Sequence, residues 1–190
     1  MKKLLITLAL FFAAFNIMAQ EHLTFKGIPI EGSMTEFCQK LRTKGFTSIA
    51  NLDNISVFTG DFTGQKATVS VMATDNGKNV LGVAVLFDTS KEWKTLVNTY
   101  DYYKDLYTRK YGSPAISKEN NPAFSDSNSS LMYELSQGTV VYGSAWEIKG
   151  GDIRVSIEKS SESYRGGYVT IVYRDSQNVE NKIKSDLEDI

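Results

Sequence analysis

Apolar side chains recur at helical spacing in two segments of the chain. The first segment follows Ser33 and has four apolar positions on one helix face, namely Met34, Phe37, Cys38 and Leu41. Ser33 and Glu36 are spaced as a capping box, in which each side chain accepts a hydrogen bond from the backbone amide of the other residue. Gly45 can adopt the left-handed geometry that ends a helix. We therefore predict a helix after Ser33, with Cys38 as a buried structural thiol.

The second helical segment is longer and runs from Ser90 to Tyr111. Steps of three and four residues join Trp93, Leu96, Val97, Tyr100, Tyr103 and Tyr107. Thr89 and Glu92 are spaced as a second capping box. A stripe of this kind buries itself against a sheet, so we expect Trp93 to be part of the core.

Alternation of apolar and polar residues predicts strands in both parts of the chain. In the first part the predicted strands are 23–30, 55–62, 67–73 and 80–87. In the second part they are 131–135, 139–148, 153–159 and 168–174. The segment 113–130 is rich in Ser and Asn and is typical of a long surface loop. Apolar residues at every fourth position from Val179 predict a short C-terminal helix.

The two parts of the chain have the same order of predicted elements. Residues 33–88 and 90–175 each read as one helix followed by three strands, which suggests an internal repeat. We predict an α+β fold in which the strands form one antiparallel sheet and both helices pack on one face. The other sheet face would then be free to bind a partner.

The first 19 residues have the three-part pattern of a cleavable signal peptide. Lys2 and Lys3 form its cationic start, an apolar run covers Leu4–Phe15, and Ala19 is the small residue at the predicted cut. The apolar run is shorter than the roughly 20 residues of a membrane-spanning helix. We expect a protein exported to the periplasm or the exterior, with one domain over residues 20–190 and no insertion into a membrane.

Charge and cysteine count narrow the classes of partner. Without Lys2 and Lys3 the chain has 19 basic and 22 acidic residues, a net charge of −3. This balance offers no electrostatic attraction to nucleic acid. Cys38 is the one cysteine in the sequence, so the chain forms no internal disulfide and its core must hold the exported domain together.

Few residues of the sequence are suited to catalysis or metal binding. His22 is the one histidine and follows the predicted cut closely, so we expect it to be mobile and solvated. With one histidine and one cysteine, the usual zinc ligand sets are excluded by count. No EF-hand pattern or nucleotide motif is present, and we predict no cofactor, no metal and no catalytic residue.

Carboxylates leave one enzymatic alternative. A pair of facing acids could hydrolyse glycosides in an envelope or dietary polymer. The acidic residues are scattered, however, and several occupy turns or helix starts, such as Asp75, Asp152, Glu36 and Glu92. The carboxylate-based hydrolase therefore stays the alternative to a binding protein.

The tyrosines of the long helix offer a candidate binding residue. Tyr102 falls off the apolar stripe, and an exposed tyrosine provides a large amphipathic contact surface. We predict that Tyr102 contacts a protein or glycan partner. The function that we expect is that of an exported, non-enzymatic binding or interaction domain, and an oligomer built through the free sheet face is a further alternative.

Two resemblances add to this interpretation. The stretch Leu23–Gly32 with the following Phe37, Leu41 and Gly45-Phe46, together with Lys110–Pro114, resembles small uncharacterised exported proteins of Bacteroidetes. That resemblance implies a Gram-negative periplasmic or secreted setting. The order of elements is also similar to the two-repeat architecture of β-lactamase inhibitor proteins, although this chain lacks their disulfides.

Overall fold

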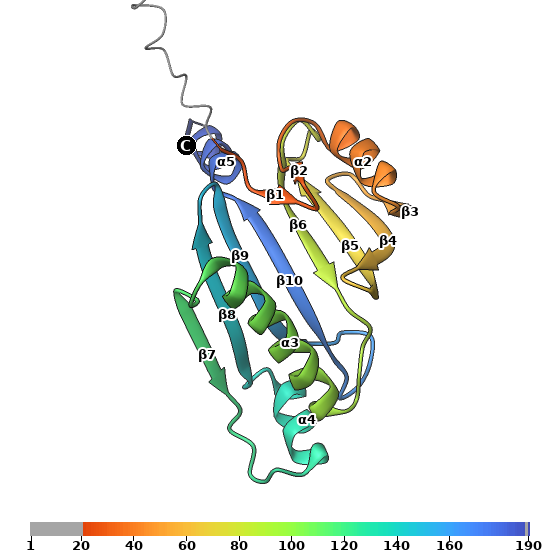
Figure 1. Cartoon of the computed structure of the whole chain (residues 1–190), viewed down its shortest axis with the longest axis vertical. Coiled ribbons are helices and arrows are strands. Elements are labelled where there is room, and N and C mark those ends of the chain that lie inside the picture. The colour runs from red at the N-terminus through yellow and green to blue at the C-terminus, as the bar shows by residue number, and fades with distance from the viewer. Residues whose placement is uncertain (1–20, 189) are drawn as a thin grey trace, which may run out of the picture.

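One antiparallel sheet of eight strands forms the centre of the computed structural model, which describes residues 21–188 and 190 (Figure 1). The predicted signal peptide lies outside the described residues. The strands follow the order β3 (Thr47–Asn51), β4 (Ile55–Phe62), β5 (Gln65–Ala73), β6 (Val80–Leu86), β10 (Gly167–Asp175), β9 (Gly151–Lys159), β8 (Val141–Ile148) and β7 (Ile116–Asn120). The α+β class and the antiparallel sheet are as predicted.

Each half of the chain contributes four consecutive strands, and the last strands of the two halves, β6 and β10, pair in the middle of the sheet. The prediction of one helix and three strands for each half therefore missed one strand per half. Neither β3 nor β7 was predicted, because their side chains are almost all exposed and show no alternation. The strand order is the same in both halves, while an internal duplication of the sequence stays a prediction.

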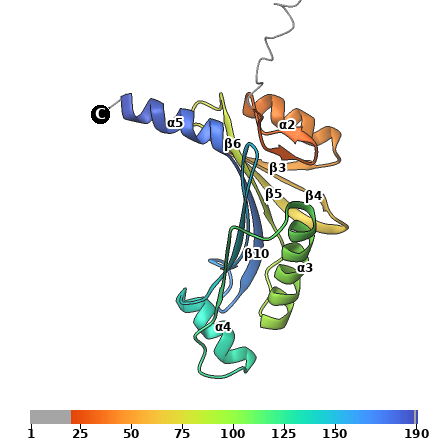
Figure 2. The ribbon, with the colours of Figure 1, turned by 60° about the vertical axis from the view of Figure 1, so that its left-hand side comes forward.

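Two helices pack on the same face of the sheet (Figure 2). Helix α2 (Met34–Thr43) begins at the predicted capping box, in which the Ser33 hydroxyl accepts from the Glu36 amide at 3.3 Å. It buries Phe37, Cys38 and Leu41. Helix α3 (Trp93–Tyr111) buries Leu96, Tyr100, Tyr103 and Tyr107, which belong to the predicted stripe.

The start of α3 differs from the prediction. The helix begins at Trp93 and not at Ser90, and its cap, Glu92, makes no side-chain capping bond. The Trp93 amide instead donates to the side-chain oxygen of Asn128 at 2.7 Å, at the start of the next helix. The second capping box is therefore wrong, because a residue distant in the sequence satisfies the helix amide.

The segment between α3 and β8 holds a strand and a helix where a loop and a strand were predicted. Residues 113–130 contain β7 and the first residues of α4 (Asn128–Gln137), and the predicted strand 131–135 is part of α4. Met132 and Leu135 are its buried residues, three positions apart. Such a short apolar run fits the periodicity of a strand as well as that of a helix. Packing against α3, β9 and β10 stabilises the helix.

The predicted first strand is a small hairpin. Two short strands, β1 (Thr24–Phe25) and β2 (Ile28–Pro29), pair around a turn at Lys26 and Gly27. Phe25 stacks on Phe62 with ring centroids 5.8 Å apart. The hairpin thus covers the helix side of the sheet between α2 and α3.

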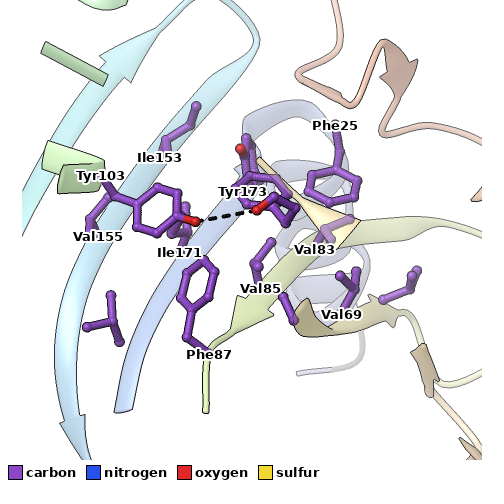
Figure 3. Close-up of a cluster of buried hydrophobic side chains, with 14 of the residues drawn as sticks. Phe25, Val69, Val83, Val85, Phe87, Tyr103, Ile153, Val155, Ile171 and Tyr173 are labelled. Carbon is purple, nitrogen blue, oxygen red and sulfur yellow. Dashed lines mark hydrogen bonds between the residues drawn. The ribbon is translucent and has the colours of Figure 1, made fainter. Parts of the chain in front are cut away.

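The core lies between the sheet and these elements (Figure 3). Phe25, Phe87, Tyr103 and Tyr173 meet there above the valines and isoleucines of the central strands. Trp146 is 1% exposed, and its indole nitrogen donates to the Gly112 carbonyl at 2.9 Å. Trp93 is only partly buried and packs edge-on against Tyr142. The central tryptophan of the core is therefore Trp146, in place of the predicted Trp93.

The last helix, α5 (Ser176–Glu188), confirms the predicted C-terminal helix and begins three residues earlier than predicted. It leaves the end of β10 and extends on the side of the sheet opposite to α3 (Figure 2). We call that uncovered side the open face. Within residues 21–188, no helix is both long and apolar enough to cross a bilayer.

Candidate functional site

A pocket of about 350 Å³ opens where three elements meet on the helix side of the sheet. These elements are the β1–β2 turn, the β4–β5 turn and the C-terminal half of α3. The lining residues are Thr24, Lys26, Gly27, Phe62, Thr63, Tyr103, Leu106, Tyr107, Lys110, Tyr111 and Tyr173. We call this site the aromatic pocket. Its size falls within the range of small-molecule sites.

Both turns beside the aromatic pocket have an unusual residue at a left-handed position. Lys26 and Gly27 have φ of 52° and 76°, and Thr63 and Gly64 have φ of 54° and 82°. Positive φ at both central residues is the geometry of a type I′ hairpin turn, which favours Asn-Gly. A β-branched threonine is strained there, at a cost of about 1–2 kcal/mol.

Thr63 is held in this conformation by its hydroxyl. Its oxygen lies 2.8 Å from the Tyr103 hydroxyl, and it donates to the Phe62 carbonyl at 2.7 Å. These contacts explain why a threonine occupies the strained position. They also fix the Tyr103 ring at the pocket wall.

The walls of the aromatic pocket are buried aromatic side chains. Phe62, Tyr103, Tyr107 and Tyr173 are all buried, and the Tyr107 and Tyr173 hydroxyls are hydrogen-bonded to each other. Burial raises the pKa of Tyr103, Tyr107 and Tyr173 above the usual value of 10. These phenols are therefore neutral at physiological pH, so they offer apolar faces and hydroxyls but no phenolate base or nucleophile.

Two ammonium groups lie at the rim. The Lys26 Nζ is 5.8 Å from the Phe62 ring centroid, and the Lys110 Nζ is 4.9 Å from that of Tyr111. Among residues 21–188, neither lysine has a carboxylate within ion-pair distance. Contacts with ring faces leave the ammonium protons free for a ligand. No acidic residue lines this pocket.

A second, more open hollow of about 680 Å³ lies between the N-terminal segment, α2 and α5. His22 lines it, and here the prediction of a mobile, solvated histidine is wrong. The His22 side chain is 16% exposed, and its Nδ1 lies 3.1 Å from a carboxylate oxygen of Asp175, which is fully buried. The pair is separated by 153 residues in sequence, and no local pattern reveals it.

The Asp175 carboxylate is an anchor as well as a partner for His22. It accepts from the Leu23 amide and from the Asn178 amide, both at 2.9 Å, and the latter bond caps the start of α5. Asn178 in turn donates to the carbonyls of Ile30 and Val80. In the part of the chain described here, the lining of this hollow contains no serine or cysteine. The His22–Asp175 pair therefore has no serine or cysteine beside it in the hollow, and it joins the N-terminal segment to β10.

A third polar cluster connects α3 to β7. The Tyr100 hydroxyl lies 2.7 Å from the Ser144 hydroxyl and donates to Glu119 at 3.1 Å, and Lys104 forms an ion pair with Glu119. Burial raises the pKa of Tyr100 to about 12. The hydrogen bond from Lys104 is the largest cause that lowers the pKa of Glu119, whereas partial burial raises that of Asp101.

The remaining predicted site residues lie apart from the aromatic pocket. Tyr102 is 44% exposed and packs edge-on against Tyr103, and it does not line the aromatic pocket. Its role in partner binding stays a prediction. Cys38 is a free, buried thiol, as expected. In the described part of the chain, no group of three or more His, Cys, Asp or Glu side chains could hold a metal ion.

Comparison with known proteins found no matching family model, no matching curated protein and no matching solved structure. The resemblances noted from the sequence therefore stay predictions.

Proposed function

We propose that this chain is an exported, non-enzymatic binding domain, and that its aromatic pocket binds a small organic anion with an apolar body. The observation that carries the proposal is the pairing of buried aromatic walls with the two rim ammonium groups of Lys26 and Lys110. A carboxylate at the rim would reach these lysines while its apolar body covers Phe62 and Tyr107.

The chemistry of the lining supports binding over turnover. A catalytic site needs a group that takes or gives a proton near neutral pH, or a nucleophile activated by such a group. The buried tyrosines of the aromatic pocket, Tyr103, Tyr107 and Tyr173, have raised pKa values, and no histidine, cysteine or carboxylate is among the lining residues. The site instead combines apolar surface with a few polar groups, as ligand sites commonly do.

Calorimetric titration with matched small molecules tests the proposal. Phenylacetate is the probe, phenylacetamide lacks its charge, and acetate lacks its apolar body. We expect phenylacetate to bind with a Kd on the order of 10–1,000 µM, as suits a ligand of this size. The amide and acetate should each bind at least tenfold more weakly. Equal affinity for phenylacetate and its amide would contradict a role for the lysines.

Variants locate the site. Lys110→Gln and Lys26→Gln should each weaken phenylacetate binding several-fold, whereas Lys94→Gln, an exposed lysine at the other end of α3, should leave it unchanged. Tyr111→Ala should weaken binding of phenylacetate and of longer apolar carboxylates together, because it removes part of the wall. If Lys94→Gln has the same effect as Lys110→Gln, the anion is attracted by overall charge and the pocket assignment is wrong.

One observation favours the hydrolase alternative enough to test it. The Glu119 carboxylate helps to raise the pKa of Asp101, whereas the hydrogen bond from Lys104 lowers the pKa of Glu119, and the acid and the base of a hydrolase likewise differ in pKa. Tyr142, which pairs with Glu119 across the strands, and Trp93, which packs on Tyr142, are partly buried and could stack on a sugar ring. The test is an assay of hydrolysis on a panel of polysaccharides. Activity that is lost in Asp101→Asn and also in Glu119→Gln would establish this alternative. Activity that is absent or unaffected by these variants would exclude this acid pair.

A further inference from the structure

Helix α5 carries an apolar stripe that the domain itself does not cover. Val179, Ile183 and Leu187 follow each other at four-residue steps and therefore share one helix face. Ile183 is 52% exposed and Leu187 is 60% exposed. Within 176–188, Asn178 is the one buried residue, so α5 is attached to the domain through its first turn. A helix of this length is marginally stable in water without packing.

The open face of the sheet offers a matching surface in its N-terminal half. Three cross-strand rows face that side: Ile55, Met72 and Gly82; Val57, Ser70 and Ala84; and Thr59, Thr68 and Leu86. Along β4, β5 and β6 these residues alternate with the buried side chains of the core, so they lie on the opposite face, where Gly82 is buried and the other eight are half-buried. We call the nine residues the uncharged patch, because none of them is ionisable.

The rows of the uncharged patch are shaped to receive large side chains. Gly82, Ala84 and Ser70 are small and lie in neighbouring strands, so the patch is shallow at its centre. Isoleucine and leucine of a helix pack well on such a surface, as α2 and α3 do on the other side of the same sheet. With a helix on the open face as well, the sheet would lie between two layers of helices.

The direction of α5 points to a second molecule. The helix extends away from the open face of its own sheet (Figure 2), and Ile183 and Leu187 are exposed along it. We propose that two copies of this chain form a closed dimer in which α5 of each copy lies on the uncharged patch of the other. Reciprocal docking of this kind has twofold symmetry, buries both unpartnered surfaces and leaves no free end for further growth.

Charges agree with a second copy as the occupant. The polar side of α5 balances itself, since Lys182 pairs with Asp186 and Lys184 pairs with Glu180. An uncharged patch calls for an occupant with an uncharged contact face, and the stripe of α5 is such a face. A strongly charged partner would gain nothing there. The dimer does not involve the aromatic pocket, so this inference is independent of the proposed function.

Light scattering coupled to size exclusion tests the dimer with the purified exported protein. At about 50 µM we expect twice the mass of one chain. The double variant Ile183→Glu with Leu187→Glu should elute at the mass of one chain, with a dimer Kd raised at least tenfold. Ser185→Glu, on the opposite side of α5, is the matched control and should stay dimeric.

A second variant examines the receiving surface. Val57→Lys places a charge in the uncharged patch and should dissociate the dimer as the α5 variant does, with Met72→Lys as the substitute if the melting temperature of the first falls. If light scattering gives the mass of one chain for the unmodified protein, the proposal is wrong. The same holds if that single chain binds lipid vesicles through α5. A dimer that the α5 variant dissociates but neither folded sheet variant affects would also overturn it, because the helix would then pair elsewhere.

Discussion

The two halves of the sheet have the same strand order but are covered and used differently. The N-terminal half is covered by the ten residues of α2, and its open face presents the uncharged patch. The C-terminal half is covered by the nineteen residues of α3, and charged residues such as Arg154, Asp152 and Glu158 lie on its open face. The longer helix also reaches past the sheet centre and supplies the aromatic pocket.

This difference shows how one strand arrangement supports two separate surfaces. The extra turns of α3 bring Tyr107, Lys110 and Tyr111 to the turns of the N-terminal half, where the aromatic pocket forms. The shorter α2 does not extend to an equivalent position. Ligand binding is thus expected on the helix side and association on the open face, and each can be disturbed without the other.

The largest effect on stability is expected within the C-terminal half, from its two tryptophans Trp93 and Trp146. Trp146→Ala removes a fully buried indole and its hydrogen bond to Gly112, and should lower the free energy of unfolding by about 3–5 kcal/mol. Trp93→Ala removes a partly buried ring and should cost about 1–2 kcal/mol. Urea unfolding followed by circular dichroism measures both. Equal losses would mean that Trp93 belongs to the core as fully as Trp146 does.

Helix capping should also distinguish the halves. Ser33→Ala removes a complete capping box and should cost about 1 kcal/mol. Thr89→Ala should leave the free energy of unfolding within about 0.5 kcal/mol of that of the unmodified protein, because α3 has no side-chain cap. Thermal unfolding of the two variants decides this. A larger loss at Thr89 would show that α3 begins where the sequence predicts it.

Sequence reasoning succeeded where side chains are half-buried and failed where they are not. The alternation of Val69 and Val71, or of Val155 and Ile157, reports one covered sheet face, so these strands were predicted. The edge strands β3 and β7 have no covered face of their own, and their backbone hydrogen bonds alone define them. Local patterns cannot report pairing of that kind.

The sites were harder to predict than the fold. Each X-Gly turn at the aromatic pocket is visible in the sequence, but the meeting of Lys26 with Thr63 and α3 depends on the tertiary fold. The His22–Asp175 pair likewise joins the two ends of the domain. The tyrosine stripe was correctly assigned to the core, and its role as a pocket wall follows from the length of α3.

A smaller effect is expected from pH at the edge of the C-terminal half. The pKa of Glu119 is lowered below its usual value of 4.5, so the carboxylate stabilises the fold above that pH. This contribution is lost as pH falls through the lowered pKa. Glu119→Gln should therefore cost less than about 1 kcal/mol at pH 7, since the group is partly exposed, and the difference from the unmodified protein should disappear as pH falls through the lowered pKa. Urea unfolding at several pH values measures it. A difference that is independent of pH would point to a steric cause.

The smallest effect on stability is expected at Tyr102. Its ring is partly exposed, so Tyr102→Ala should change the free energy of unfolding by less than about 0.5 kcal/mol, while Tyr103→Ala, one residue further on, should cost about 3–5 kcal/mol. Binding of a protein or glycan partner is the measurement in which Tyr102 should matter. If Tyr102→Ala is as stable as the unmodified protein and binds the partner equally well, Tyr102 is not part of the interaction surface.

The pairing of β6 with β10 has a consequence for the order in which the chain can fold. Val85 pairs with Ile171, so the inner edge of the N-terminal half stays open until the last strand is available. An unpaired strand edge can pair with a neighbouring molecule, and closing such a distant contact is slow. The same last strand carries Asp175, which holds the N-terminal segment at His22 and Leu23. The arrival of β10 therefore completes the sheet and secures the start of the domain in one late step, and a molecule stalled before that step is the species most exposed to aggregation during folding.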